Sequence, residues 1–124
     1  MNKTSLRYKL VSSLGAFALW GGWSFYINNK VSYKDGVVSG ILQGISSAFV
    51  TLMLVYLVTF YANQFTRKQM KITLTPVLSV TTTGLLVVFA HLLVGTPSIF
   101  WTVFPMIITG YFFSLFTVLA ITRE

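Results

Sequence analysis

Four long runs of apolar residues, separated by short polar segments, dominate the pattern along this chain. The runs cover residues 10–27, 37–62, 76–94 and 98–121, and none contains Asp, Glu, Lys or Arg. Each run is about 18 to 26 residues long, and a helix of that length, at about 1.5 Å per residue, crosses a hydrocarbon core of about 30 Å. The pattern predicts an all-α fold, an integral membrane four-helix bundle in which residues 1–124 form a single transmembrane domain.

The first run follows a basic segment and therefore also resembles a secretory signal peptide, with a cleavage-like Ala16-Phe17-Ala18. The apolar stretch ahead of that point, residues 10–15, is short for a signal. Cleavage would also leave an odd number of spans. We therefore expect the first run to be a retained span.

Charge gives the expected orientation. Seven basic residues precede the first run, separate the second from the third, or follow the fourth: Lys3, Arg7, Lys9, Arg67, Lys68, Lys71 and Arg123. Only Lys30 and Lys34 lie in the other connections, beside Asp35. The positive-inside rule then places both termini in the cytoplasm, N-in/C-in, and the size and topology favour a bacterial inner membrane. All three tryptophans fall on the expected outer side, where amphipathic rings are favoured at the headgroup level.

Composition supports a membrane location and limits the partners. The chain is 55% hydrophobic and only 9% charged, with a mean hydropathy of +0.77, which leaves too little polar surface for a soluble domain. The net charge of +7 is spread over short clusters between spans. Such clusters favour membrane lipids with anionic headgroups over nucleic acid as the partner.

Residues at the expected helix ends suggest ordinary capping. Asp35 immediately precedes the second span, where its carboxylate can accept from free backbone N–H groups. The pairs Thr75–Pro76 and Thr96–Pro97 both resemble a cap followed by proline at the first helical position. Gly95 suits a left-handed cap at the end of the third span. The third and fourth spans should then form a tight hairpin.

One proline falls within the fourth span. Pro105 lies about two turns after its start, so it should act as a hinge there. Because proline lacks an N–H, the carbonyl of Trp101 should lose its helical partner.

The second span carries small residues at four-residue spacing, which place them on one helix face. This glycine ridge consists of Gly36, Gly40, Gly44 and Ala48. Small residues allow two helix backbones to approach closely in a membrane, so the ridge predicts a helix-packing face. Its partner is either another span of the same chain or a second copy.

Polar side chains accompany this ridge and continue on the third span. They form a hypothetical substrate path of six residues: Gln43, Ser47, Thr51, Ser79, Thr83 and His91. His91 is the only ionisable side chain inside a span, and such groups are functional candidates because they need a partner or water. A structural role is the alternative, in which a neutral histidine hydrogen-bonds a nearby group. One histidine without cysteine does not indicate a metal site.

The sequence excludes several chemistries more readily than it indicates one. No carboxylate lies within a span, and Asp35 and Glu124 fall at opposite membrane faces, so neither a glutamate-based proton carrier nor paired acid–base catalysis is expected. No phosphate-binding glycine loop or nucleophile motif is present. We therefore expect a non-enzyme without a cofactor.

The leading functional hypothesis is movement or presentation of a small or lipid-linked substrate across the bilayer, as in a transporter or flippase. The first alternative is a structural, regulatory or immunity-type subunit that performs no transport. The third is a holin-like pore former that uses the ridge between copies. We expect the chain to form a homo-oligomer or to join a larger membrane complex; a large ring would favour the pore former, and a monomer or dimer would favour the first two hypotheses.

Overall fold

Four helices make up the computed structural model, which describes residues 6–123. They are α1 (Leu6–Asn28), α2 (Tyr33–Ala62), α3 (Lys68–Val94) and α4 (Ile99–Arg123). All four are long and apolar enough to cross a membrane. The expected all-α membrane fold is therefore confirmed, whereas the N-in/C-in orientation stays a prediction. Lys3 and Glu124, which entered the charge argument, lie outside the described residues.

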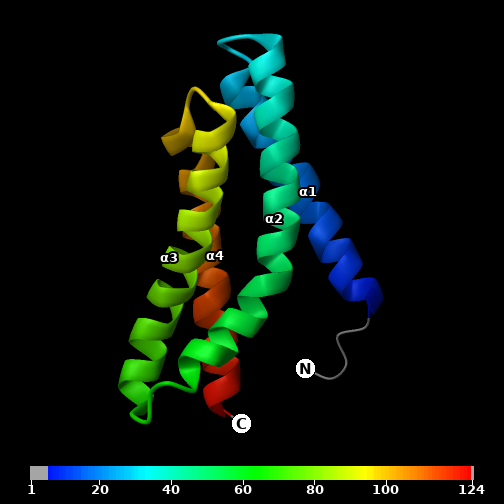
Figure 1. Cartoon of the computed structure of the whole chain (residues 1–124). Coiled ribbons are helices and arrows are strands. Elements are labelled where there is room, and N and C mark those ends of the chain that lie inside the picture. The colour runs from blue at the N-terminus through cyan, green and yellow to red at the C-terminus, as the bar shows by residue number, and fades with distance from the viewer. Residues whose placement is uncertain (1–5, 124) are drawn as a thin grey trace.

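The helices form two hairpins, α1–α2 and α3–α4, with α2 in contact with all three other helices. Within residues 6–123, α1 contacts α2 and α4 but not α3. The loops within the two hairpins, residues 29–32 and 95–98, lie at one end, here called the hairpin end (Figure 1). Residues 63–67, the start of α1 and the end of α4 lie at the opposite, terminal end. The first half of α1 diverges from the other helices toward the terminal end.

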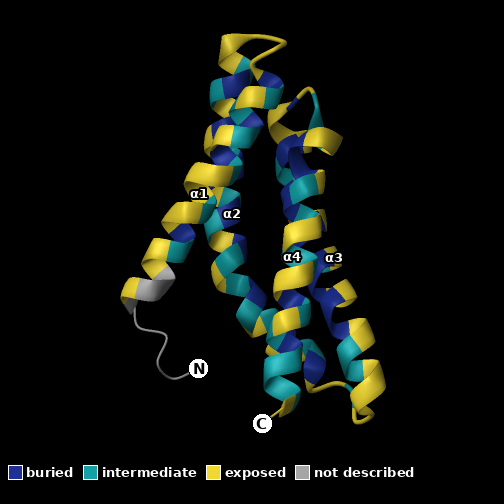
Figure 2. Ribbon diagram, turned by 180° about the vertical axis from the view of Figure 1, so that it is seen from behind, coloured by how far each residue is buried: buried dark blue, intermediate teal, exposed yellow. Residues whose placement is uncertain are grey.

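In the part of the chain that the structure describes, buried side chains are more often polar than hydrophobic, and Figure 2 shows where the buried residues lie along the helices. Among the described residues, thirteen polar side chains are buried, compared with nine hydrophobic ones. Large apolar side chains such as Leu93 (72% exposed) and Phe116 (66% exposed) point outward. This distribution suits a lipid environment, where apolar groups gain nothing by leaving the surface and polar groups must find partners inside.

Two of the expected helix starts are wrong. α3 begins at Lys68, so Pro76 lies inside the helix rather than at its first position. Because Pro76 lacks an N–H, the helix loses one backbone hydrogen bond there. Residues 68–71 are good helix formers, and they extend the helix ahead of the proline. α4 begins at Ile99, and the carbonyl of Ser98 accepts from the N–H of Thr102 at 3.0 Å. Thr96 and Pro97 therefore precede the cap.

The residue that caps the start of α2 also differs from expectation, whereas the expected left-handed cap at Gly95 is confirmed. Ser32 is the N-cap of α2, and its hydroxyl accepts from the Asp35 N–H at 3.0 Å. Asp35 itself sits in the first turn, where its charge still faces the positive end of the helix dipole. Gly95 adopts the left-handed conformation, with φ 77° and ψ 36°. Its N–H reaches Leu92 O, while Thr96 N–H reaches His91 O at 3.1 Å, forming a Schellman motif.

Candidate functional site

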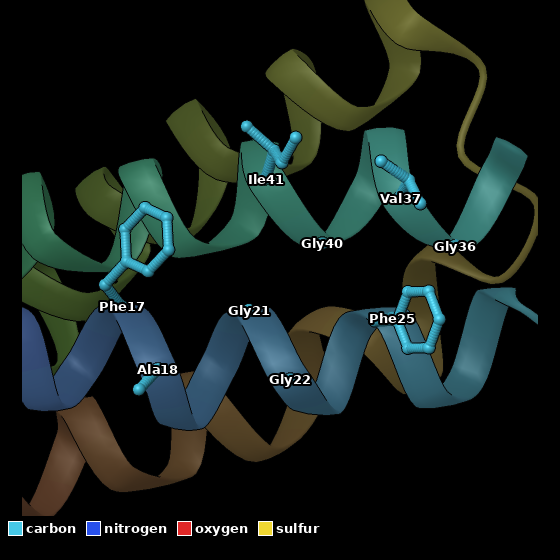
Figure 3. Close-up of a pocket in the computed structure, with 9 residues that line it drawn as sticks. All are labelled: Phe17, Ala18, Gly21, Gly22, Phe25, Gly36, Val37, Gly40 and Ile41. Carbon is cyan, nitrogen blue, oxygen red and sulfur yellow. The ribbon is translucent and has the colours of Figure 1, made fainter.

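The glycine ridge of α2 packs against α1 of the same chain (Figure 3). A Cβ atom added to Gly40 would lie 3.0 Å from the carbonyl oxygen of Gly21, and one added to Gly21 would lie 3.0 Å from the carbonyl oxygen of Gly40. Gly44 faces the ring of Phe17, and Gly36 faces Asn29. The two backbones are thus in direct contact, and a Cβ atom at Gly21 or Gly40 would crowd the facing carbonyl.

Ala48, the last member of the ridge, is half-buried. Beyond the glycine contacts α1 diverges, so close packing is confined to the hairpin-end part of α2. A groove of about 240 Å³ borders this contact and is lined by apolar residues and glycines, including Phe17 and Phe25.

His91 lies at the centre of a hydrogen-bonded cluster near the hairpin end, and its side chain is fully buried. Its Nε2 lies 2.6 Å from Gln43 Oε1, and its Nδ1 lies 2.7 Å from Thr96 Oγ1. An amide oxygen can only accept, so in the neutral ring Nε2 donates to Gln43 and Nδ1 accepts from the Thr96 hydroxyl. Both ring nitrogens are therefore satisfied by the chain itself.

The same cluster extends to α4 through a methionine sulfur. Gln43 Nε2 donates to Met106 Sδ at 3.2 Å, and the Ser47 hydroxyl donates to the same sulfur at 3.3 Å. Thioether sulfur is a weak acceptor, so these contacts orient the donors more than they stabilise the fold. The cluster joins α2, α3, α4 and the turn after α3.

A second cluster ties α1 to the start of α4. Asn28 is fully buried, and its Nδ2 donates to Thr102 Oγ1 at 2.8 Å and to Ser24 O at 2.9 Å. Its Oδ1 accepts from the Ser98 N–H at 3.0 Å, so the amide side chain uses both its donor and its acceptor atom. The Thr102 hydroxyl in turn donates to Ser98 O at 2.6 Å.

A tryptophan supplies the partner of the carbonyl that Pro105 leaves free. Trp23 Nε1 donates to Trp101 O at 2.8 Å, across the α1–α4 contact. α4 continues through Pro105 without interruption. The proline thus creates an acceptor that a neighbouring helix uses.

The six residues of the hypothetical path do not form one continuous group. Gln43, Ser47 and His91 meet in the cluster at the hairpin end. The hydroxyls of the two threonines return to carbonyls of their own helices: Thr51 donates to Ser47 O at 2.8 Å, and Thr83 donates to Ser79 O at 3.2 Å.

Ser79 belongs to a different set, the hydroxyls buried without a hydrogen-bond partner. Among the described residues, this set has four members: Ser13, Thr75, Ser79 and Ser114. Thr75, Ser79 and Ser114 are all fully buried, on α3 and α4. A buried hydroxyl without a partner costs free energy, so these positions weaken the packing of α3 and α4.

Residues outside the predicted path complete both clusters. Sequence reasoning missed Asn28, Thr96, Thr102 and Met106 as functional candidates. Asn28 lies one position beyond the predicted first span, and the four-residue spacing from Ser24 was the available signal. Thr96 was interpreted as a cap, although the αL turn at Gly95 directs it back to His91.

The clusters contain hydrogen-bonding groups and no set of charged ligands. Within residues 6–123, no three His, Cys, Asp or Glu side chains gather in a way that could hold a metal ion. Comparison of this chain with protein families, curated proteins and solved structures finds no match.

Proposed function

We propose that this protein is a non-transporting subunit of a membrane complex, whose rigid helical frame presents an apolar outer surface to a partner. The observation that supports this most directly is the pairing of His91 with Gln43 and Thr96 in a fully buried position. A transport path needs polar groups that are free to meet water or substrate. Here these groups hydrogen-bond one another and fix α2, α3 and the turn after α3.

The proposal places the protein in a bacterial inner membrane with both termini in the cytoplasm. The basic residues at the terminal end support this placement, since cytoplasmic connections are enriched in Lys and Arg. The partner is another membrane protein or further copies of this chain. The ridge glycines contact α1, so the docking surface must use other, outward-facing side chains.

Site-specific photocrosslinking tests the subunit proposal. A photoreactive residue replaces Phe49, Leu93 or Phe116, which are highly exposed on three different helices, and the buried Val118 serves as the control. In native membranes we expect discrete protein crosslinks from one exposed face and none from Val118. Crosslinks to lipid alone from every exposed position would contradict the proposal.

Movement or presentation of a small or lipid-linked substrate is the second candidate function. The unpartnered hydroxyls of Thr75, Ser79 and Ser114 favour it, because a substrate that entered the terminal-end half of the interior would find hydrogen-bonding groups that no other side chain uses. In proteoliposomes, a transporter predicts that Ser79→Ala reduces substrate movement without loss of stability. A subunit predicts that Ser79→Ala is neutral or stabilising, because it removes a polar group that has no partner.

The pore-forming alternative has less support. A holin-like assembly would use the ridge between copies, but Gly40 and Gly44 pack against Gly21 and Phe17. Oligomeric size in mild detergent distinguishes this hypothesis from the other two, because a pore former should assemble into a large ring.

A further inference from the structure

An apolar groove lies between α3 and α4 on the outer surface, about halfway along the two helices. It has a volume of about 350 Å³, and its lining includes Val77 and Thr81 of α3 and Ile108 and Phe112 of α4. Val77, Ile108 and Phe112 are 48%, 43% and 50% exposed, so the groove faces the surrounding membrane. A concave apolar surface at this depth can receive a hydrocarbon chain.

Basic residues gather at the terminal end of the same two helices. Arg67, Lys68 and Arg123 are exposed there, and Lys71 is half-buried. Asp35, the one acidic residue in the described part of the chain, lies at the opposite end. The terminal end of the α3–α4 hairpin therefore complements an anionic headgroup.

The separation between the basic residues and the groove matches one lipid leaflet. Val77 follows Lys71 by six residues, which is about 9 Å along a helix, and Thr81 follows it by ten, about 15 Å. Half of a hydrocarbon core of about 30 Å is also about 15 Å. A lipid with its headgroup at the terminal end thus has its acyl chain at the depth of the groove.

We propose that the α3–α4 groove binds an acyl chain of an anionic phospholipid whose headgroup contacts Arg67, Lys68 and Lys71. The basic residues at the hairpin end are less suited to this role. Lys30 and Lys34 lie near Asp35, and Lys30 Nζ sits 4.7 Å from the centroid of the Tyr26 ring. The bound lipid should therefore come from the membrane leaflet at the terminal end. The site is independent of the function proposed above.

Native mass spectrometry of the full-length protein tests the headgroup contacts. The probes are phosphatidylglycerol and phosphatidylcholine with identical acyl chains. We expect several-fold greater retention of phosphatidylglycerol, decreasing as salt is raised because exposed charges are screened. The triple variant R67Q/K68Q/K71Q should lose the preference, while the control K30Q/K34Q should keep it. Equal retention of both lipids by the unmodified protein would overturn the proposal.

A second pair of variants tests the groove. Val77→Phe places a ring in the groove, whereas Leu78→Phe adds the same ring at the neighbouring position, which does not line it. We expect Val77→Phe to reduce retention of phosphatidylglycerol several-fold and Leu78→Phe to leave it unchanged, with equal helix content by circular dichroism. Equal retention by the two variants would refute the groove as the site. A change in oligomer size with Val77→Phe alone would identify the occupant as a second copy and also refute the lipid proposal.

Discussion

The hydrogen bond between His91 and Gln43 links α3 to α2 at a fully buried position. Gln43→Leu should leave the His91 Nε2–H without an acceptor, at a cost of about 1–3 kcal/mol in the free energy of unfolding. The double variant Gln43→Leu/His91→Leu should recover part of that loss, because both partners are then apolar. A double-mutant cycle measured by unfolding in mixed detergent should give a coupling energy of about 0.6 to 1.7 kcal/mol.

The same cycle has a clear negative result. Additive effects of the two single substitutions would mean that the side chains do not interact. His91 would then be available for substrate or protons, as the transport hypothesis requires.

The indole of Trp23 and the carbonyl of Trp101 form a bond that depends on Pro105. In the native protein, Trp23→Phe should cost about 1 kcal/mol, since it removes one hydrogen bond. Pro105→Ala supplies a helical N–H to the same carbonyl, so Trp23→Phe should cost less in that background. Thermal unfolding of the four variants measures the difference. An unchanged cost would show that the indole is not held by the carbonyl that proline leaves free.

The sequence could predict features that depend on one residue's own covalent structure, but not those that depend on its neighbours in space. The free carbonyl of Trp101 follows from proline alone and needs no knowledge of the neighbours. The partner Trp23 and the pairing of His91 with Gln43 depend on how helices rotate against one another. Two polar stripes were expected on the second and third spans, but one sequence does not specify which side chains meet.

At the scale of the helices, the α1–α2 contact offers two adjacent glycines with opposite surroundings. A Cβ atom on Gly21 would meet backbone atoms of Gly40 and Gly44 at 3.0 and 3.3 Å, whereas one on Gly22 would meet nothing within 4 Å. Gly21→Ala should therefore destabilise the hairpin by about 1–3 kcal/mol through overpacking. Gly22→Ala should be neutral or stabilise α1 by up to about 1 kcal/mol through its higher helix propensity.

Unfolding in mixed detergent, followed by circular dichroism, compares the two variants directly. Equal tolerance of both substitutions would contradict the backbone contact seen between α1 and α2. Gly44→Ala should cost less than Gly21→Ala, because the atoms it meets belong to the Phe17 ring, which can move.

Helix existence was easier to predict than helix bounds. Long uncharged runs leave few alternatives to a membrane helix, because lipid offers no hydrogen bonds to the backbone. The start of α3 was misplaced by eight positions, from 68 to 76, because Pro76 resembles a first helical residue. A proline in a helix interior differs from one at the helix start only in the residues that precede it. Residues 68–75 mix charged and apolar side chains, so they did not resemble part of an apolar span.

At the scale of the whole molecule, the ends differ in charge, and this difference predicts the orientation in the membrane. Among the residues whose side chains the structure describes, the terminal end carries Arg7, Arg67, Lys68, Lys71 and Arg123, and the hairpin end carries Lys30, Lys34 and Asp35. The structure places residues 63–67 and the end of α4 at the same end of the molecule, as expected when four consecutive helices cross a membrane in alternating directions. Which end faces the cytoplasm is decided by the membrane and not by the fold.

Single cysteines can test the orientation, since the chain contains no cysteine of its own. Thr96 is a poor labelling position because it is buried and its hydroxyl bonds His91, whereas Pro97 next to it is exposed. With an impermeant thiol reagent on intact cells, we expect labelling of Pro97→Cys and none of Gln69→Cys until the membrane is permeabilised. The reason is that Gln69 lies between Lys68 and Lys71, which favour the cytoplasmic side. Labelling of Gln69→Cys from outside would reverse the orientation. It would also move the proposed lipid site to the outer leaflet.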